Sequence, residues 1–318
     1  MHIKREIREQ LVINRLLGII IILFVNLVNS QAQTKYFVLE HKSENYVIHH
    51  FTMSAKQLYG VDATVECFNI LYDGYPSDKR ALKDYDQNLI LFSVLPNLEG
   101  GPTWKEVSLD SIQKAIIPFG TLNSLFEAHT NSLFFEKYDW ETKFWNDYEI
   151  ILKRNGKFYV PTFCLLQFYA IRNRSEIFSN PFGTINIYLN ELPILGMEKI
   201  YKDRYPYSNF PLYNMGESPH RLFPFERLRD RREYLSKKIH FKNSVIAFQF
   251  WTFTDWYEHP HSYELERGID RFVYLPEKGI IGGSFDFYFY FHRKKLPIKY
   301  ADFMNNIKEE KVMIAEKI

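Results

Sequence analysis

The chain has 318 residues, of which 46% are hydrophobic and 17% aromatic, with 28 Phe and 22 Tyr. This composition supplies ample material for a buried core and excludes an intrinsically disordered chain. The formal net charge is only +2, from 40 basic and 38 acidic residues, so no strong global field would steer nucleic acid or an anionic membrane to the protein.

The beginning of the chain has the pattern of an export signal. Four basic residues precede Leu16, where the apolar run LLGIIIILFVNLV begins. Ser30 and Ala32 then form the S-x-A pattern that a signal peptidase accepts, which predicts cleavage before Gln33. The alternative is an uncleaved membrane anchor, but a spanning helix needs about 20 consecutive apolar residues and this run is shorter. We therefore expect residues 1–32 to be a signal peptide, with no membrane span left after its cleavage.

Removal of the signal changes the charge balance of the protein. Taking its 4 basic and 2 acidic residues from the 40 and 38 of the chain leaves 36 of each and a net charge of zero. We expect a periplasmic or extracellular protein that does not bind nucleic acid. No Gly/Ser run, Pro-rich stretch or charge block divides residues 33–318, which predicts a single domain.

The only two cysteines of the sequence are Cys67 and Cys164. In an oxidising compartment a disulfide between them would persist, and closing so long a loop would stabilise the fold by about 4 kcal/mol in the chain-entropy model. The alternative is two buried thiols that pack as small hydrophobic groups. The sequence leaves both open, because it does not show whether the two Cα atoms approach within about 7 Å.

Strand patterns occur on both sides of a predicted helical region. Residues 35–40 and 46–51 are rich in Tyr, Phe, Val and Ile around the polar KSEN, which predicts a hairpin. The clearest hairpin is EIILKRNGKFYVPTF at 149–163, where Asn155 and Gly156 supply the positive φ angles of a type I′ turn.

The middle of the chain favours helices. Ser108 can cap a short helix that ends near Ile117, before Pro118 and Gly120. The apolar spacing predicts further helices, with one more strand among them. The helices are expected at 122–137, 164–172, 224–238 and 301–313, and the strand at 184–189.

The last third of the chain predicts a sheet. Residues 245–254 (VIAFQFWTFT) are apolar on both faces, which indicates a central strand. RFVYL and IIGGSFDFYFYFH flank the turn PEKG as two strands, the second with Phe285 and three further Phe on one face and Asp286, Tyr288, Tyr290 and His292 on the other. We expect an α+β fold with a mostly antiparallel sheet, hairpins and several covering helices.

The segment WTFTDWYEHPHSYELERG, residues 251–268, holds the best candidate site. His259 and His261 project to the same side of an extended chain, and Asp255, Glu258 or Glu264 could complete a zinc site with them. The alternative is a polar loop at the end of a central strand, since loops collect such residues because they are solvated. No third ligand stands at a diagnostic spacing, so we expect no metal and no cofactor.

Several catalytic patterns are absent from the sequence. It contains no G-x-S-x-G, no phosphate-binding glycine loop and no H-E-x-x-H. His49 and His50 are adjacent on a predicted strand and point to opposite faces, so they do not chelate together. The catalytic residues therefore stay unassigned.

We expect an exported bacterial envelope or secreted protein that acts by binding a protein, peptide or glycan. Aromatic side chains with polar tips offer such a ligand both apolar area and hydrogen bonds. The alternative is a secreted hydrolase that uses histidine and carboxylate residues near 255–266, with or without a metal. The expected binding residues are Asp255, Trp256, Glu258, His259, His261, Tyr288 and Tyr290.

Overall fold

The structure is a computed structural model. It describes residues 34–40, 42–73, 87–126, 148–173, 183–207, 209–210, 212, 232–241, 244–253 and 269–318. Within these ranges the fold is mixed α and β, with three sheets and few helices. The predicted α+β class agrees with the structure at this level.

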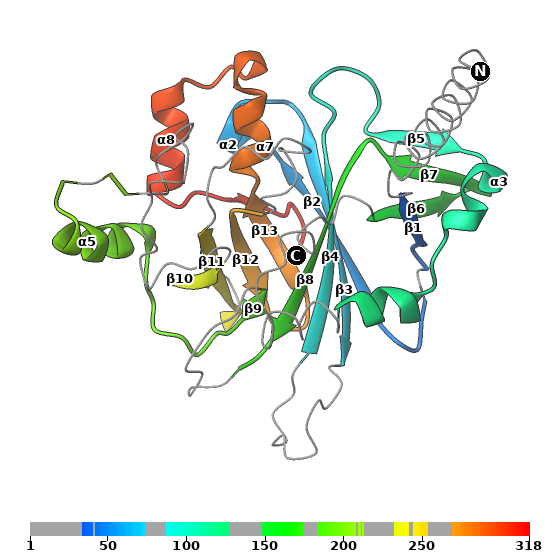
Figure 1. Cartoon of the computed structure of the whole chain (residues 1–318), viewed down its shortest axis with the longest axis horizontal. Coiled ribbons are helices and arrows are strands. Elements are labelled where there is room, and N and C mark those ends of the chain that lie inside the picture. The colour runs from blue at the N-terminus through cyan, green and yellow to red at the C-terminus, as the bar shows by residue number, and fades with distance from the viewer. Residues whose placement is uncertain are drawn as a thin grey trace, which may run out of the picture.

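The central sheet lies between the two others (Figure 1). It has the strand order β2-β3-β4-β8-β9, and its pairings are antiparallel except for the parallel pair β8–β9. Its strands are β2 (Val47–Ser54), β3 (Thr64–Asp73), β4 (Gln87–Leu95), β8 (Phe163–Ile171) and β9 (Thr184–Ile185).

Strands β3, β4 and β8 are buried on both faces. On β3, Cys67 and Leu71 belong to one core cluster, whereas Phe68 and Ile70 belong to the cluster on the opposite face. The near-continuous apolar runs of these strands account for this, because each run places apolar side chains on both faces of the sheet. The central sheet therefore needs a covering layer on each side.

The small sheet covers one of these faces. Its order is β1-β6-β7-β5, with β1 at Lys35–Val38, β6 at Tyr148–Arg154, β7 at Lys157–Pro161 and β5 at Trp104–Val107. The short helix α3 (Leu109–Ile112) and the 3-10 turn η1 (Gln113–Ala115) follow β5, and Ile112 packs with Ile151 and Val160 on the outer side of this sheet.

The predicted hairpin at 149–163 is confirmed by β6 and β7, which pair antiparallel. Its two turn residues, Asn155 and Gly156, have φ angles of 51° and 77°. These are the positive values that a type I′ turn requires, and they are determined by the local sequence alone.

The C-terminal sheet covers the other face of the central sheet. Its order is β10-β11-β12-β13-β14, all antiparallel, with β10 at Arg232–His240, β11 at Ile246–Phe253, β12 at Arg271–Leu275, β13 at Gly279–Ser284 and β14 at Met313–Ile314. The prediction that residues 245–254 form an internal strand is confirmed as far as Phe253, because β11 lies between β10 and β12.

Helices pack against the core between the central and C-terminal sheets. They are α2 (Lys56–Tyr59), α5 (Ile194–Arg204), α7 (Asp286–Phe291) and α8 (Tyr300–Lys308), with the 3-10 turn η6 (Arg293–Lys295) after α7. In Figure 1, α2, α7 and α8 lie together at one end of the strands, and α5 projects sideways. Among the described residues, no helix combines the length and the apolar character needed to cross a bilayer.

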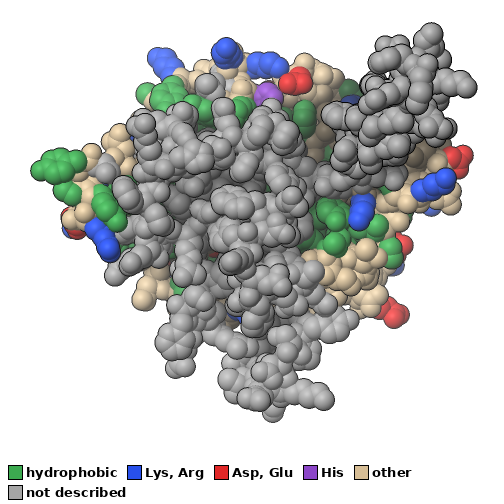
Figure 2. Space-filling view, viewed as in Figure 1, with side chains coloured by type: hydrophobic (Ala, Val, Ile, Leu, Met, Phe, Trp, Pro, Cys, Tyr) green, Lys and Arg blue, Asp and Glu red, His purple; other side chains and the backbone are tan. Residues whose placement is uncertain are grey.

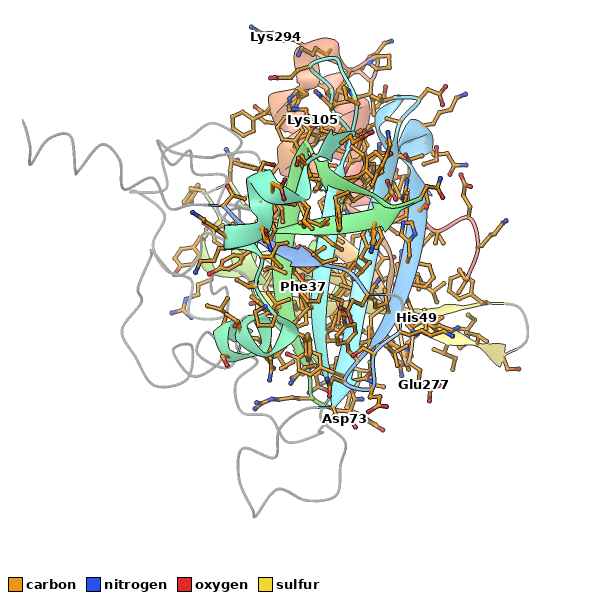
Figure 3. All side chains as sticks on the ribbon, turned by 90° about the vertical axis from the view of Figure 1, so that its right-hand side faces the viewer. Phe37, His49, Asp73, Lys105, Glu277 and Lys294 are labelled. Atoms are coloured by element: carbon orange, nitrogen blue, oxygen red, sulfur yellow. The ribbon has the colours of Figure 1, made fainter. Side chains whose placement is uncertain are left out.

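Two neighbouring side chains fasten the central sheet to the C-terminal sheet. Asn69 of β3 is fully buried, and its amide both donates to the Ile280 carbonyl (3.0 Å) and accepts from the Ile280 N–H (2.7 Å). His49, its cross-strand partner on β2, forms a hydrogen bond with the backbone of Glu277. Figure 3 shows His49 and Glu277 on the same side of the molecule. The Asn69 amide thus makes the two hydrogen bonds to Ile280 that a neighbouring strand would otherwise make.

The same two sheets are also linked along their edges. Met53 of β2 pairs with Ala315, just beyond β14. At the opposite edge, the buried carboxylate of Glu233 on β10 accepts hydrogen bonds from the N–H groups of Gly183 (2.9 Å) and Thr184 (3.3 Å). These contacts satisfy backbone groups that would otherwise be unpaired at the sheet edges.

Several predicted elements are wrong in type or in pairing. The strands at 35–40 and 46–51 exist as β1 and β2, but they belong to different sheets and form no hairpin. The predicted helix at 164–172 is strand β8, and the described part of the one at 224–238 is strand β10. For residues 164–172 the reason is that an apolar run buried on both faces has no helical or strand periodicity to distinguish the two.

Other predictions are correct only in part. The strand expected at 184–189 is reduced to β9, and the helix expected at 301–313 ends at Lys308 and is followed by β14. Residues 119–126 are helical, and the rest of the helix expected at 122–137 lies outside the described residues. The second strand expected after PEKG ends at Ser284, and the aromatic residues beyond it form α7.

We predict that Asn69→Ala lowers the free energy of unfolding by about 2–5 kcal/mol, because it leaves the N–H and C=O of Ile280 buried without partners. Urea unfolding followed by circular dichroism measures this. Asn97→Ala is the matched control, since Asn97 makes an equivalent pair of hydrogen bonds in an exposed loop, to Glu99 and Gly100. Equal losses in the two variants would contradict a special role for Asn69.

Candidate functional site

The structure describes only the two ends of the predicted site segment. Strand β11 ends at Phe253, and the described chain resumes at Ile269, next to β11. Asp255, Trp256, Glu258, His259 and His261 lie outside the described residues. The two described ends of this segment lie side by side, because the backbone N–H of Thr252 donates to the Asp270 carbonyl (2.8 Å). The residues around these ends form the candidate site.

The two predicted binding tyrosines do not share an exposed face. Tyr288 is 1% exposed, and its hydroxyl donates to the Pro96 carbonyl. Tyr290 is partly exposed and packs near Tyr300 and Phe303. The expected alternation of a core face and a polar face is wrong, because residues 286–291 form helix α7 rather than a strand. Tyrosine is a poor marker of a polar face, since its ring is readily buried when its hydroxyl finds an acceptor.

A buried ion pair stands at the base of the segment. Arg271 of β12 and Asp286 of α7 are each 2% exposed. The guanidinium donates from Nη1 to Oδ2 and from Nη2 to Oδ1 of Asp286, the latter at 3.1 Å, and its Nε donates to the Lys311 carbonyl (3.0 Å). This bidentate geometry is the one in which an arginine–carboxylate pair is strongest.

The electrostatics favour a charged arginine in this site. Burial lowers the pKa of Arg271, but the adjacent Asp286 carboxylate outweighs it, so the net pKa is raised. Burial, followed by the charge of Asp286, raises the pKa of Tyr59 well above its ordinary value. Tyr59 therefore stays protonated, and its hydroxyl donates to Oδ1 of Asp286 (2.9 Å).

The surrounding polar groups hold the beginning of α7 in place. The Tyr59 hydroxyl accepts from the Phe285 N–H (2.9 Å), and the Asp270 carboxylate accepts from the Phe287 N–H (3.3 Å). Ser284 Oγ accepts from the Arg271 N–H (3.1 Å). Strand β13 ends at Ser284 and helix α7 begins at Asp286, whose carboxylate lies buried beside Arg271.

A small pocket opens over this ion pair. Its polar lining is Thr252, Asp270, Arg271 and Asp286, and its apolar walls are Ile194, Leu212, Trp251 and Ile307. The cavity volume of about 10 Å³ is at the lower limit for one water-sized group. The pocket therefore suits a single small polar group rather than a whole ring.

Thr252 is the unusual residue of this pocket. Its side chain is 5% exposed, and its hydroxyl has no hydrogen-bond partner within the part of the chain that the structure describes. A buried hydroxyl without a partner costs about 1–3 kcal/mol. A ligand atom that pairs with this hydroxyl would recover that free energy, so the pocket can discriminate in favour of a hydrogen-bonding group.

The Asp286 carboxylate of the pocket is fully engaged in hydrogen bonds with its neighbours. Both oxygens of Asp286 accept hydrogen bonds from Arg271, and one of them also accepts from Tyr59. A general base must be able to reach a substrate proton, and Asp286 would have to break a buried ion pair to do so. The hydroxyl of Thr252, which has no partner among the described residues, can accept or donate without such a rearrangement.

The sequence predictions missed Thr252, Asp270, Arg271 and Asp286. A usable signal was present, because Asp286 is a charged residue inside an aromatic run and Arg271 stands at the beginning of the apolar RFVYL. Charged side chains are almost never fully buried unless they are paired. Two such residues on neighbouring elements therefore point to a buried ion pair.

The cysteines do not form a disulfide in the structure. Cys67 and Cys164 are free and buried, and they belong to core clusters on opposite faces of the central sheet. Burial raises the pKa of both thiols, that of Cys67 to about 12. Of the two alternatives that the sequence left open, the structure has the buried thiols that pack as hydrophobic groups.

The histidines of β2 behave as expected for adjacent strand residues. His49 contacts the turn of the C-terminal sheet, whereas His50 lies against Glu66 and Phe68, whose ring packs on the side of the small sheet. Within the described ranges, no three His, Cys, Asp or Glu side chains come together as metal ligands would.

Comparisons of the chain with protein-family models, with curated proteins and with solved structures gave no match. The functional interpretation therefore depends on the geometry of the described residues.

We predict that Arg271→Met lowers the free energy of unfolding by about 3–5 kcal/mol, because it leaves the Asp286 carboxylate buried without its cation. The double variant Arg271→Met/Asp286→Leu should recover much of this loss. Urea unfolding of the two variants and of each single change gives the coupling energy. Lys157→Met serves as the control, since its pair with Glu106 is exposed and should contribute little. A double variant no more stable than Arg271→Met would contradict this account.

Proposed function

We propose that this is an exported α+β protein, with mostly antiparallel sheets and several covering helices, that acts by binding in the periplasm or outside the cell. The pocket over Arg271 and Asp286 carries the proposal. Arg271 and Asp286 are held in buried contacts with each other, and within the described part of the chain the Thr252 hydroxyl has no partner, so it can pair with a ligand. The apolar walls and fixed polar groups of this small cavity would admit one polar group of a larger ligand.

The export part of the proposal is supported by the first 32 residues of the sequence. The formal net charge of the chain is only +2, and Figure 2 shows both basic and acidic side chains around the rim of the face that it presents. A protein, peptide or glycan ligand is then more compatible with the surface than a polyanion.

We predict that the product made by an expressing bacterial cell begins at Gln33 and is found outside the cytosol. Mass spectrometry of the fractionated product measures this. Ile21→Lys is the control, since a charge in the apolar run should block export and leave Met1 in place. An intact Met1 on the cytosolic form of the unaltered chain would exclude export.

We predict that a ligand found by thermal shift, from pools of hexapeptides and of soluble oligosaccharides, raises the Tm and is recovered chemically unchanged. Thr252→Val should weaken its binding about tenfold, the effect of one lost hydrogen bond in a buried site, whereas Thr252→Ser should retain it. Calorimetric titration with the ligand measures both. The valine variant should fold at least as well as the parent, because it removes a buried hydroxyl that has no partner among the described residues.

The competing function is hydrolysis by the residues near 255–266. Recovery of the ligand as cleaved product would contradict the binding proposal and favour this alternative. A stoichiometric bound metal that is lost in His259→Ala/His261→Ala would assign the chemistry to those two histidines. Equal affinity of the Thr252→Val and Thr252→Ser variants would remove the pocket from the binding proposal.

A further inference from the structure

A second polar and aromatic cluster lies away from the pocket, where the central sheet and the small sheet meet. His50 of β2 and Glu66 and Phe68 of β3 come from the central sheet, and Trp104 of β5 and Arg154 of β6 come from the small sheet. We call these five residues the intersheet corner. In Figure 1 the small sheet lies on the side of the central sheet opposite to β11 and β12, and Lys105, next to Trp104, is labelled in Figure 3.

Glu66 is the centre of the intersheet corner. Its Oε1 accepts a hydrogen bond from Trp104 Nε1 (2.6 Å), and its Oε2 lies 2.9 Å from His50 Nε2. Burial raises the pKa of Glu66, but the hydrogen bonds from His50 and Trp104 outweigh burial, so the net pKa is lowered. The carboxylate is therefore ionised at neutral pH, and it fixes the orientation of both rings.

The rings of the corner also pack on one another. The imidazole of His50 is stacked on Phe68 with centroids 4.1 Å apart, and Phe68 meets Trp104 edge to face at 6.1 Å. The Arg154 guanidinium lies over the indole, 5.8 Å from its centroid. These contacts hold the aromatic groups in one arrangement before a ligand arrives, which lowers the entropy cost of binding.

The corner presents unused hydrogen-bonding groups to solvent. His50 is 39% exposed, and its second ring nitrogen, Nδ1, has no hydrogen-bond partner among the described residues. Arg154 is exposed beside the indole, and a guanidinium carries five N–H donors. The surface thus combines donors, an acceptor and aromatic edges within one small area.

The charges of the corner nearly cancel, because the Glu66 carboxylate stands against the Arg154 guanidinium. An anionic ligand would approach Glu66 as well as Arg154, and a cationic ligand would meet the reverse conflict. A neutral molecule with many hydroxyl groups has no such conflict, since hydroxyls both donate and accept. The C–H faces of a sugar ring also suit the apolar surface of an aromatic side chain.

We propose that the intersheet corner is a binding site for a neutral saccharide chain. Trp104 and His50 supply the aromatic surface, Arg154 donates to sugar hydroxyls, and Glu66 positions the two rings without contacting the sugar. This site adds to the proposed binding function and depends on different residues from the pocket. A negative result with the Thr252 variants would not contradict the saccharide site, and a negative result with the saccharides would not contradict the pocket.

The test uses the protein labelled with ¹⁵N at tryptophan, titrated with neutral hexasaccharides of β-1,4-glucan, α-1,4-glucan, β-1,4-mannan and β-1,4-xylan. The sequence has 5 Trp, and the variant Trp104→Phe identifies the indole signal of Trp104. We expect at least one of these sugars to shift that signal in a saturable manner. Arg154→Lys should weaken binding about tenfold, because lysine lacks the planar set of donors.

Arg204→Lys is the matched control, because the Arg204 guanidinium also lies over a ring, that of Tyr205, but on α5. It should leave the titration unchanged. The saccharide proposal is overturned if none of the four sugars moves the Trp104 signal, or if Arg154→Lys binds as well as the parent. Tighter binding of an oligogalacturonate than of every neutral sugar would also overturn it. Arg154 is exposed, so its variant tests the site even if Trp104→Phe folds poorly.

Discussion

The constraint on which the rest of the structure depends is the burial of β3, β4 and β8 on both faces. Leu89 and Leu91 face one core cluster, and Ile90 and Phe92 face the other, so successive residues of a single strand serve two cores. Neither face tolerates water, because each removes a row of large apolar side chains from solvent. The small sheet and the C-terminal sheet follow from this requirement, one on each side.

Neighbouring layers of the three stacked sheets must keep one relative position, although they share no continuous ladder of backbone hydrogen bonds. Buried polar side chains fix this position by hydrogen bonding to backbone groups of the next layer. The Asn69 amide bonds both the N–H and the C=O of Ile280, and the Glu233 carboxylate accepts from two consecutive N–H groups at the sheet edge. Unlike apolar contacts, which are non-directional, these bonds have one satisfied geometry, so they specify where the layers meet.

The parts of the fold that were predictable from sequence are those set by local geometry. Asn155 and Gly156 determine their turn because few other residues accept positive φ, and this holds whatever surrounds the hairpin. The segment 164–172 was not predictable in the same way, because a strand buried on both faces and a buried helix have the same apolar composition. The Asp286–Arg271 contact just beyond the end of β13 joins α7 to β12. It is a tertiary contact, so the local sequence does not predict it.

The same distinction explains what could be foreseen of the candidate sites. The hydrogen-bonding capacity of His50 or Thr252 follows from the residue type. Whether that capacity is available to a ligand depends on the neighbouring side chains in the fold. Among the described residues the Thr252 hydroxyl has no partner, and Asp286 of the same pocket is bonded to Arg271 and Tyr59. The His50 ring is oriented by Glu66 on the next strand. Both sites lie where the layers end, at the start of α7 and at the corner between two sheets. Between the layers the side chains form closed hydrophobic cores, so the ends of the layers are the places where a ligand can meet preorganised polar groups.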